Sequence, residues 1–344
     1  MQCKKIEQGL SVCSFTHMST IDLQENKIKR VFDMSDKSYQ ILILNRNYLK
    51  VVPCDLLPST LKHLSLDENE LQNLEIDMPF PHLQTLSLEM NKLKYLDIQT
   101  ILPSLHSLNL QKNHIYNLDF LLSLPSLKDL NISYNDVSTI KFLPQTLERF
   151  KANFCDVKII QSRLPPGLQE LHLHGNMLRS GSLPMSWGTQ LRSLKLGGNN
   201  LKEFPKRLPD SLEELGLQYN NITEIPSILP KNLRSLYLDG NRIRILPKTV
   251  NVKLDILLVS KNCLTQDLET DPISYARHIF AMENWNKETH HISQTKIKQC
   301  WKRYILKKRL RHFYRTHCII SELLMISLHP DRILQTDIFS PEWF

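Results

Sequence analysis

Residues 212–247, LEELGLQYNNITEIPSILPKNLRSLYLDGNRIRILP, contain one pattern twice. The shared residues recur after 21 positions: Leu212, Leu215, Leu217, Asn220 and Ile222 in the first copy, and Leu233, Leu236, Leu238, Asn241 and Ile243 in the second. A fixed period of this length is the sequence signature of a protein built from stacked repeats. The pattern L-x-x-L-x-L-x-x-N-x-L therefore decides the fold.

The same pattern extends backward and forward from this stretch, in twelve copies spaced 20 to 23 residues apart. Its asparagine position is occupied by Asn26, Asn47, Asn69, Asn91, Asn113, Asn135, Cys155, Asn176, Asn199, Asn220, Asn241 and Asn262. One copy deviates, with Phe150 and Ala152 at leucine positions and Cys155 in place of asparagine. We expect the asparagines to be structural, because a buried amide can satisfy backbone groups of neighbouring turns.

The pattern resembles that of leucine-rich repeat proteins. The resemblance implies an α/β solenoid whose short strands form a curved parallel sheet on the concave face. Copies with a second proline, such as the one containing Phe204-Pro205, resemble short bacterial-type repeats. Those carrying Asn91, Asn113 and Asn135 resemble the phosphatase-regulator type. We expect the array to span residues 18–264, with residues 1–17 as an N-terminal cap.

The return path between strands has about a dozen residues, too few for two corners and a helix of average length. Leu-Pro pairs precede most strands, for example Leu102-Pro103 and Leu124-Pro125. Proline fixes φ near −65° and is excluded from helix interiors. The return arms are therefore predicted to be extended, polyproline-like or 3₁₀, and the solenoid to form an open arc.

Alternate residues of each strand point inward, so the residues between the leucines form the outward face. This face is polar in the middle of the array and apolar at both ends, where Ile41, Ile43, Ile256 and Leu258 lie outward. Such a polar row favours a protein-binding concave surface over a merely solvated sheet. The candidate partner-binding residues are Asn109, Asn131, Lys151, Asn153, His172, His174, Lys195 and Tyr237, with Tyr134, Phe154 and Tyr219 beside them.

Composition indicates an intracellular protein that we expect in the cytoplasm. The seven cysteines form no close-spaced framework, and no run of about 18 apolar residues predicts a transmembrane segment. The start lacks the hydrophobic block of a signal peptide. The net charge is +8, yet nine basic residues without an acid lie between Thr295 and Arg315, so the other residues sum to −1. The basic character therefore belongs to one segment.

Residues 265–344 carry no repeat and are predicted to form a small helical region. Asp271-Pro272 is typical of a helix start, and a second helix is expected near Ser293, with Ile297 and Trp301 on its apolar side. This second helix resembles a calmodulin-binding IQ motif, although Lys298 replaces its glutamine. Its candidate binding residues are Lys298, Trp301, Lys302, Arg303, Lys307, Lys308, Arg309 and Arg311.

Three roles compete for this basic helix. It caps the array with its charges solvated, or it binds an acidic protein such as calmodulin. The third role is contact with RNA or an anionic membrane, which basic charge interleaved with aromatic residues favours, although no RNA-binding motif supports it.

Enzymatic function has little support in the sequence. Only nine glycines are present and none forms a phosphate-binding loop, while His172 and His174 lack partners for a metal site. No cofactor is therefore predicted. Bacterial effectors with similar repeats carry a cysteine-dependent ubiquitin-ligase domain, which would require Cys300 or Cys318 as nucleophile here. About eighty residues are too few for that domain, so we treat it as a remote alternative.

The order of short repeats, IQ-like helix and S-x-H-P-D-R tail (Ser327 to Arg332) resembles leucine-rich repeat proteins of giant DNA viruses. That resemblance implies an interaction protein in the cytoplasm of an infected host cell. The leading hypothesis is a non-enzymatic scaffold that binds a protein partner on its concave face. The alternative is an adaptor that acts through its basic helix.

Overall fold

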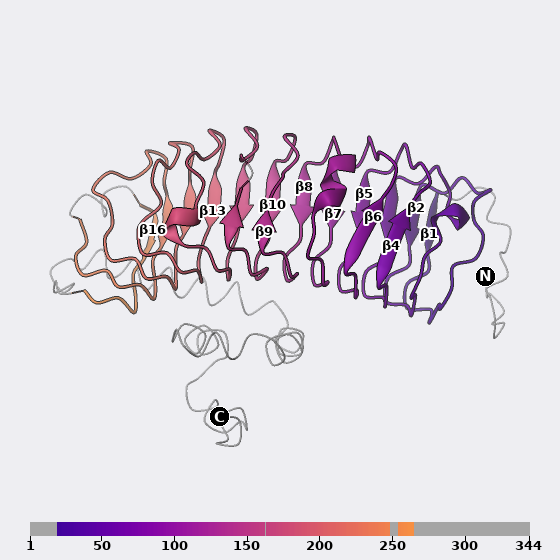
Figure 1. The fold of residues 1–344 in the computed structure, drawn as a ribbon, viewed down its shortest axis with the longest axis horizontal. Coiled ribbons are helices and arrows are strands. Elements are labelled where there is room, and N and C mark those ends of the chain that lie inside the picture. The colour runs from indigo at the N-terminus through magenta and orange to yellow at the C-terminus, as the bar shows by residue number, and fades with distance from the viewer. Residues whose placement is uncertain (1–18, 162, 248–253, 265–344) are drawn as a thin grey trace, which may run out of the picture.

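The protein is described by a computed structural model for residues 19–161, 163–247 and 254–264. One parallel sheet of twelve strands runs through the whole described chain (Figure 1), in the order β1-β2-β3-β5-β7-β8-β10-β12-β13-β14-β15-β16. Its strands are β1 (Thr20–Asp22), β2 (Ile41–Ile43), β3 (His63–Ser65), β5 (Thr85–Ser87), β7 (Ser107–Asn109), β8 (Asp129–Asn131), β10 (Arg149–Lys151), β12 (Glu170–His172), β13 (Ser193–Lys195), β14 (Glu214–Gly216), β15 (Ser235–Tyr237) and β16 (Ile256–Leu258). Each strand is one predicted repeat, which establishes a leucine-rich repeat β-solenoid.

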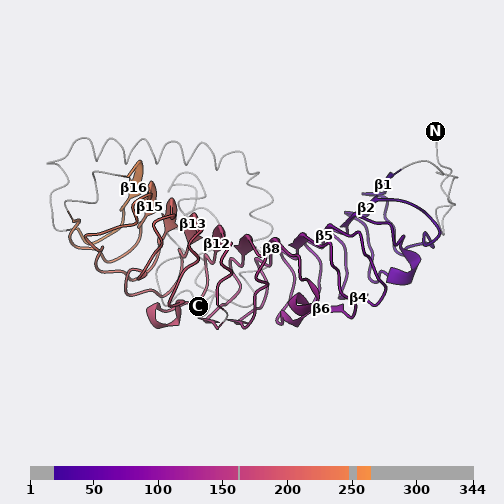
Figure 2. The same ribbon diagram turned by 90° about the horizontal axis from the view of Figure 1, so that it is seen from above.

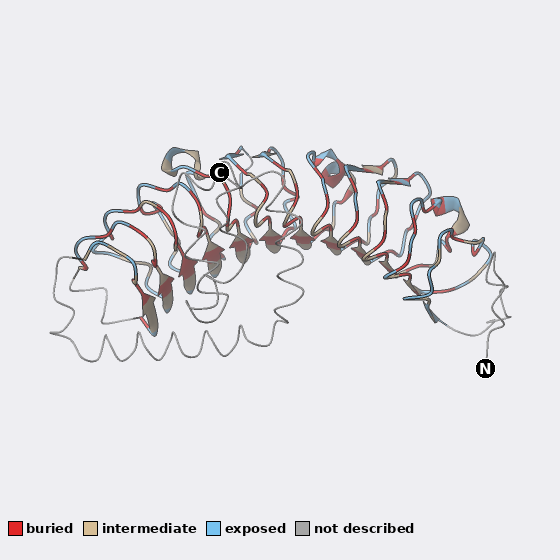
Figure 3. Cartoon of the chain, turned by 90° about the horizontal axis from the view of Figure 1, so that it is seen from below, coloured by how far each residue is buried: buried red, intermediate tan, exposed pale blue. Residues whose placement is uncertain are grey.

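The solenoid forms an open arc with the twelve-stranded sheet on its inner side (Figures 2 and 3). Neighbouring strands pair at equivalent positions, so that Leu194 faces Leu215 and Leu215 faces Leu236. The constant register places residues of equal rank in straight rows across the sheet. The open curvature agrees with the prediction from the short return arms.

The outer side of the arc consists of extended segments and three short 3₁₀ turns: η1 (Cys54–Leu56), η2 (Asp119–Ser123) and η3 (Ser180–Ser182). This confirms the predicted extended and 3₁₀ return arms. The predicted α/β class is corrected to a β-solenoid, because the described residues contain strands and 3₁₀ turns and no α-helix. Two small parallel sheets were not predicted, namely β4 (Asn73–Ile76) with β6 (Tyr95–Ile98), and β9 (Thr139–Ile140) with β11 (Ile159–Ile160). The β4–β6 sheet forms because two repeats of 22 residues bring Leu74 and Ile76 level with Leu96 and Ile98.

A continuous leucine core fills the space between the inner sheet and the return arms. The deviant repeat keeps the core filled by a change of sizes, since both Phe150 and Ala152 are fully buried. A large ring at one leucine position is thus offset by a methyl group at the next. Close packing of this kind makes both positions sensitive to a change of volume.

The repeated asparagines form a buried ladder along the end of the sheet. In a typical repeat, Asn113 Nδ2 donates to the carbonyls of Leu88 (2.8 Å) and Leu110 (3.0 Å), and its Oδ1 accepts from the Leu93 N–H (3.0 Å). The side chain therefore ties its own repeat to the preceding one. Cys155 reproduces part of this arrangement, with Sγ 3.0 Å from the Ile132 carbonyl. The structural role predicted for the asparagines is confirmed.

The predicted N-terminal cap and the helical region of residues 265–344 lie outside the described residues. The repeat pattern accounts for the described structure up to Leu264. In the part of the chain that the structure describes, no helix is long and apolar enough to cross a membrane.

Candidate functional site

The concave face carries three outward rows of side chains, one residue per strand in each row. The first outward row contains Thr20, Ile41, His63, Thr85, Ser107, Asp129, Arg149, Glu170, Ser193, Glu214, Ser235 and Ile256. The second contains Asp22, Ile43, Ser65, Ser87, Asn109, Asn131, Lys151, His172, Lys195, Gly216, Tyr237 and Leu258. The third contains Gln24, Asn45, Asp67, Glu89, Gln111, Ser133, Asn153, His174, Gly197, Gln218, Asp239 and Ser260.

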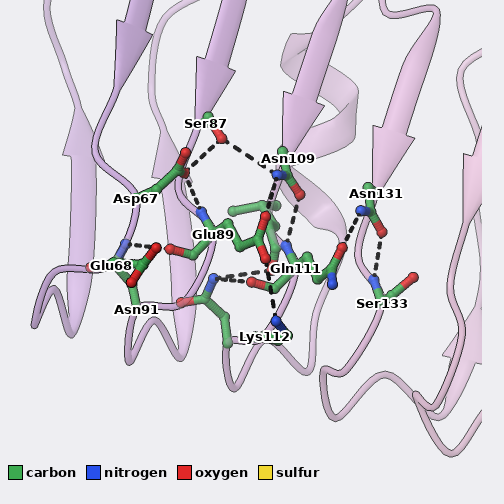
Figure 4. A network of polar contacts seen from close by, with 12 residues as sticks. Asp67, Glu68, Ser87, Glu89, Asn91, Asn109, Gln111, Lys112, Asn131 and Ser133 are labelled. Carbon is green, nitrogen blue, oxygen red and sulfur yellow. Dashed lines mark hydrogen bonds and ion pairs between the residues drawn. The ribbon is translucent and has the colours of Figure 1, made fainter. Parts of the chain in front are cut away.

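Asn109 and Asn131, two of the predicted binding residues, belong to a network of polar side chains on the sheet (Figure 4). Asn109 Oδ1 accepts from the backbone N–H of Gln111 (3.1 Å), and its amide nitrogen approaches Ser87 and Glu89. Asn131 Oδ1 likewise accepts from the Ser133 N–H (3.1 Å), while Nδ2 donates to Gln111 (2.7 Å). These side chains therefore satisfy backbone groups just beyond the strands as well as facing the concave side.

Asn153 has a similar backbone role in the next repeat. Its Oδ1 accepts from the His174 N–H (2.9 Å), and its own N–H donates to Ser133 Oγ (3.1 Å). A partner that used the Asn153 amide oxygen would have to share or replace this bond. The charged and aromatic side chains are consequently better placed for binding than the three asparagines.

Lys151, His172 and Lys195 lie side by side in the second outward row, and we call these three residues the central row. They come from β10, β12 and β13 and are direct register partners. Both lysines form ion pairs across neighbouring strands, Lys151 with Glu170 (4.0 Å) and Lys195 with Glu214 (3.2 Å). Each of these four side chains keeps about a third or more of its surface exposed. Ion pairs at this exposure contribute only about 0–1 kcal/mol to stability.

His172 is neutral at pH 7 in this setting. Burial lowers its pKa from 6.5 to about 4, and the positive charges of Lys195 and Lys151 act in the same direction against the smaller opposing effect of Glu214. His172 Nε2 lies 3.3 Å from Ser193 Oγ, which donates to Glu214 (2.8 Å). The central row thus presents a neutral imidazole between two ammonium groups.

Replacement of His172 by glutamine is expected to reduce the pH dependence of stability. Since the folded pKa is lower than the unfolded value, the unfolded chain binds more protons as the pH falls from 6.5 toward 4. The part of the folding free energy that is linked to His172 is therefore fully present above pH 6.5 and declines below it. Urea denaturation at pH 7 and pH 5 should show a loss of about 1–2 kcal/mol in the native protein, after allowance for solvent screening. An equal loss in His172→Gln would contradict this assignment.

The contacts of His172 differ from those of a catalytic histidine. In a hydrolytic triad the histidine lies between the nucleophile and a carboxylate, whereas here Ser193 lies between His172 and Glu214. The low pKa also makes the imidazole a weak base at neutral pH. Burial raises the pKa of the Cys54 thiol to about 12, which disfavours its reactive thiolate. Among the described residues, no group of three metal-ligating side chains could hold a metal ion.

Tyr237 stands two strands beyond Lys195 in the same row, with Gly216 between them. Gly216 leaves room for the Gln218 side chain, whose Oε1 would lie 3.0 Å from a Cβ at that position. Tyr237 is half-buried. Its large amphipathic ring lies on the far side of Gly216, the one position between Tyr237 and the central row, which has no side chain. Tyrosine in such a position is a typical anchor of protein interfaces.

A further line of residues, which we call the corner row, follows the third outward row. Each of its members has φ between 53° and 67°, a left-handed conformation that ends the strand. The corner row comprises Glu25, Arg46, Glu68, Met90, Lys112, Tyr134, Phe154, Gly175, Gly198, Tyr219, Gly240 and Lys261. Near its start Arg46 bridges Glu25 (2.6 Å) and Glu68 (3.1 Å).

The structure brings together most of the predicted concave residues and adds features that the sequence analysis missed. His174 lies in the third row, two residues after His172, whereas Asn109 and Asn131 lie two and one strands before Lys151. The missed features are the ion pairs between strands and the stacking of the Tyr134 and Phe154 rings in the corner row, whose centroids are 4.9 Å apart. The signal for the pairs was present, because Lys151 and Glu170 are 19 residues apart. The predicted basic helix, including Lys298, Trp301, Lys302, Arg303, Lys307, Lys308, Arg309 and Arg311, lies outside the described residues.

Comparison with known proteins supports the fold. No protein-family model and no curated protein matches the chain. A solved structure of a Leptospira interrogans LRR protein is 27% identical, covers 72% of this chain and 80% of its own, and superposes with a TM-score of 0.56. The leucine-rich repeat domain of APL1B is 22% identical, with coverages of 72% and 78% and a TM-score of 0.59.

A third similar structure is an octameric complex of Latrophilin 3, Unc5D and the LRR protein FLRT2. The match is 23% identical, covers 73% of this chain and 86% of the other, and has a TM-score of 0.59. Together these structures agree with the leucine-rich repeat solenoid described above. These similarities concern the fold, so any statement about function rests on the residues of the concave face.

Proposed function

We propose that the chain is a non-enzymatic protein-interaction scaffold whose concave face binds a protein partner. The observation that carries the proposal is the central row, Lys151, His172 and Lys195, held in register by three adjacent strands. The strands are fixed by the leucine core and the asparagine ladder, so that little backbone order has to be created on binding. Preorganisation of this kind reduces the entropic cost of association.

The ion pairs of the central row can be replaced by ion pairs with a partner. Each lysine is half-exposed and pairs with one carboxylate of the chain itself, Glu170 or Glu214. Because such pairs contribute little to stability, a partner carboxylate can compete for the lysines at small cost. Neutral His172 offers a flat surface between them, and Tyr237 adds an aromatic anchor. The known complex that contains FLRT2 shows that a leucine-rich repeat protein of similar fold occurs in a protein assembly.

The proposal is tested by affinity capture from cell lysate with the full chain and two triple variants. In the first, Lys151, His172 and Lys195 are replaced by alanine; in the control, the exposed lysines Lys94, Lys141 and Lys158 near the convex strands are replaced instead. We expect at least a tenfold loss of the captured partner with the first variant and none with the control. Equal capture by the native chain and the central-row variant would refute the assignment of the concave face.

A further inference from the structure

One exposed position per repeat forms a basic line along the edge of the arc at which the inner strands end. It is the third residue after the repeated asparagine or cysteine, and it is exposed in all eleven repeats for which the structure describes it. We call this line the edge row, and its members are Lys29, Lys50, Gln72, Lys94, Tyr116, Ser138, Lys158, Arg179, Lys202, Thr223 and Arg244. Seven of the eleven are lysine or arginine and none is acidic, although the whole chain has 43 basic and 35 acidic residues. The row therefore concentrates one sign of charge.

Backbone hydrogen bonds hold the edge row in line. The Lys94 N–H donates to the Gln72 carbonyl (3.2 Å), and the Lys158 N–H donates to the Ser138 carbonyl (2.9 Å). Each of these bonds joins two members of the row from successive repeats. Neighbouring members are therefore about one strand spacing apart, roughly 4.8 Å, and ten spacings make a row about 48 Å long.

The charges of the edge row are not compensated within the array. Six of its seven basic members, all except Arg244, form no ion pair among the described residues. Lys158, Arg179 and Lys202 come from three successive repeats, so that like charges follow one another directly. Like charges at adjacent positions are destabilising, and an external polyanion would remove this repulsion. The central-row lysines differ, because each has a carboxylate of the chain as its partner.

The residues on either side of the edge row favour a linear polyanion over a flat one. Glu70, Asp136 and Asp156 come two residues before members of the row, and Glu203 and Glu224 come one residue after. A flat anionic membrane on this edge would bring these carboxylates close to lipid phosphates. A single polymer strand can follow the row and contact its basic side chains alone.

Three exposed tyrosines accompany the lysines of the edge row. Tyr116 belongs to the row and is 63% exposed, while Tyr95 directly follows Lys94 and is 42% exposed. Tyr48 comes two residues before Lys50 and is 47% exposed. Proteins that bind single-stranded nucleic acid combine basic and aromatic side chains in this way, because every base has a face that can stack on a ring. An acidic peptide would pair with the lysines without this use of the rings.

We propose that the edge row binds a single-stranded nucleic acid. The phosphates pair with the lysines and arginines of the row, and bases stack on the exposed tyrosines. At the 3.4 Å spacing of a stacked strand, a row of about 48 Å takes about 14 nucleotides. Binding is independent of base sequence, because charges and ring faces do not read base edges. The edge row is separate from the outward rows, so this inference goes beyond the proposed function and concerns a second ligand.

The salt dependence of binding tests the charge contacts. Fluorescence anisotropy measures the affinity of the full chain for a labelled oligouridylate of about 20 nucleotides, long enough to cover the row. The test variant is Lys94→Gln with Lys158→Gln and Lys202→Gln. For single strands the logarithm of the affinity falls with the logarithm of the salt concentration by about 0.7 per phosphate neutralised. We therefore expect the test variant to reduce this slope by about 2 and to bind at least tenfold more weakly at about 0.1 M salt.

A charge-matched control separates the edge row from the net charge of the protein. It carries Lys128→Gln, Arg192→Gln and Arg234→Gln, at exposed positions on the edge where the strands begin. We expect the control to keep the slope of the native chain. An equal loss in both variants would overturn the proposal. Unchanged binding in the test variant would also overturn it, as in the case that residues 295–315 carry all of the binding.

A tyrosine variant and a second probe test the nature of the ligand. Tyr116→Ser removes a ring and no charge, so we expect at least fivefold weaker binding of the oligouridylate with an unchanged salt slope. The alanine variant of the central row should bind the oligouridylate with the native salt slope, which keeps this result independent of the concave-face proposal. Absence of oligouridylate binding by the native chain would overturn the proposal. Row-dependent binding of phosphatidylserine vesicles in its place would show that the ligand is a membrane.

Discussion

Replacement of Asn113 by alanine is expected to lower the free energy of unfolding by about 3 kcal/mol. The substitution removes a side chain that is 2% exposed and leaves the Leu93 N–H and the Leu88 and Leu110 carbonyls without their amide partner. Each buried polar group left unsatisfied costs about 1–3 kcal/mol. Urea denaturation followed by circular dichroism measures the change.

The matched control for this experiment is Asn232→Ala, at an exposed asparagine on a return arm. We expect a change below about 0.5 kcal/mol there, as for surface substitutions in general. If both alanine variants unfolded at the same urea concentration as the native protein, the asparagine ladder would not hold the repeats together.

Replacement of Phe150 by alanine should cost about 3–5 kcal/mol, because a fully buried ring is removed from a close-packed core. Position 150 differs from its equivalents in other repeats, because its neighbour in the core, Ala152, is small and the Phe150 ring supplies most of the volume. The account therefore also predicts that Phe150→Leu combined with Ala152→Leu, which restores the repeat pattern, stays within about 1 kcal/mol of the native protein. The exchange keeps the number of side-chain carbon atoms in the core unchanged, and repacking that stays close to the native size is tolerated best.

The two single leucine variants complete this test. Ala152→Leu alone overfills the core and should cost about 1–3 kcal/mol, and Phe150→Leu alone leaves a cavity. Strict additivity of the two changes would show that residues 150 and 152 do not compensate each other, contrary to the packing seen in this repeat.

Much of the fold followed from the sequence because its determinants are local and periodic. Leucines at fixed ranks define the strands, and the asparagine after each strand satisfies the backbone of its neighbours. The β4–β6 sheet was not anticipated from residues such as Asn73 and Tyr95, because the leucine pattern identifies the inner strands and does not mark extended pairing between the return arms. The arc itself followed from the short, proline-rich return arms.

The candidate site was predictable in position but less so in chemistry. Lys151, His172, Lys195 and Tyr237 were placed on the outward face by the strand period alone. Their pairing with Glu170 and Glu214 depends on which residues become neighbours when repeats of different length are stacked. Asn153 illustrates the limit, since its amide appears free in the sequence and accepts a backbone N–H in the structure. The position of the Phe154 ring also required Gly175, since a Cβ at residue 175 would lie 2.3 Å from that ring.

The most direct test of the central claim is site-specific photo-cross-linking to the partner found by affinity capture. A photoreactive phenylalanine analogue is placed at position 193 or 237 on the concave face, and at position 116 or 228 outside its outward rows as controls. Tyr116 and Ile228 are 63% and 85% exposed, so that both control positions are accessible. We expect the partner to cross-link from positions 193 and 237 and not from 116 or 228. Cross-linking from the two control positions alone would contradict it.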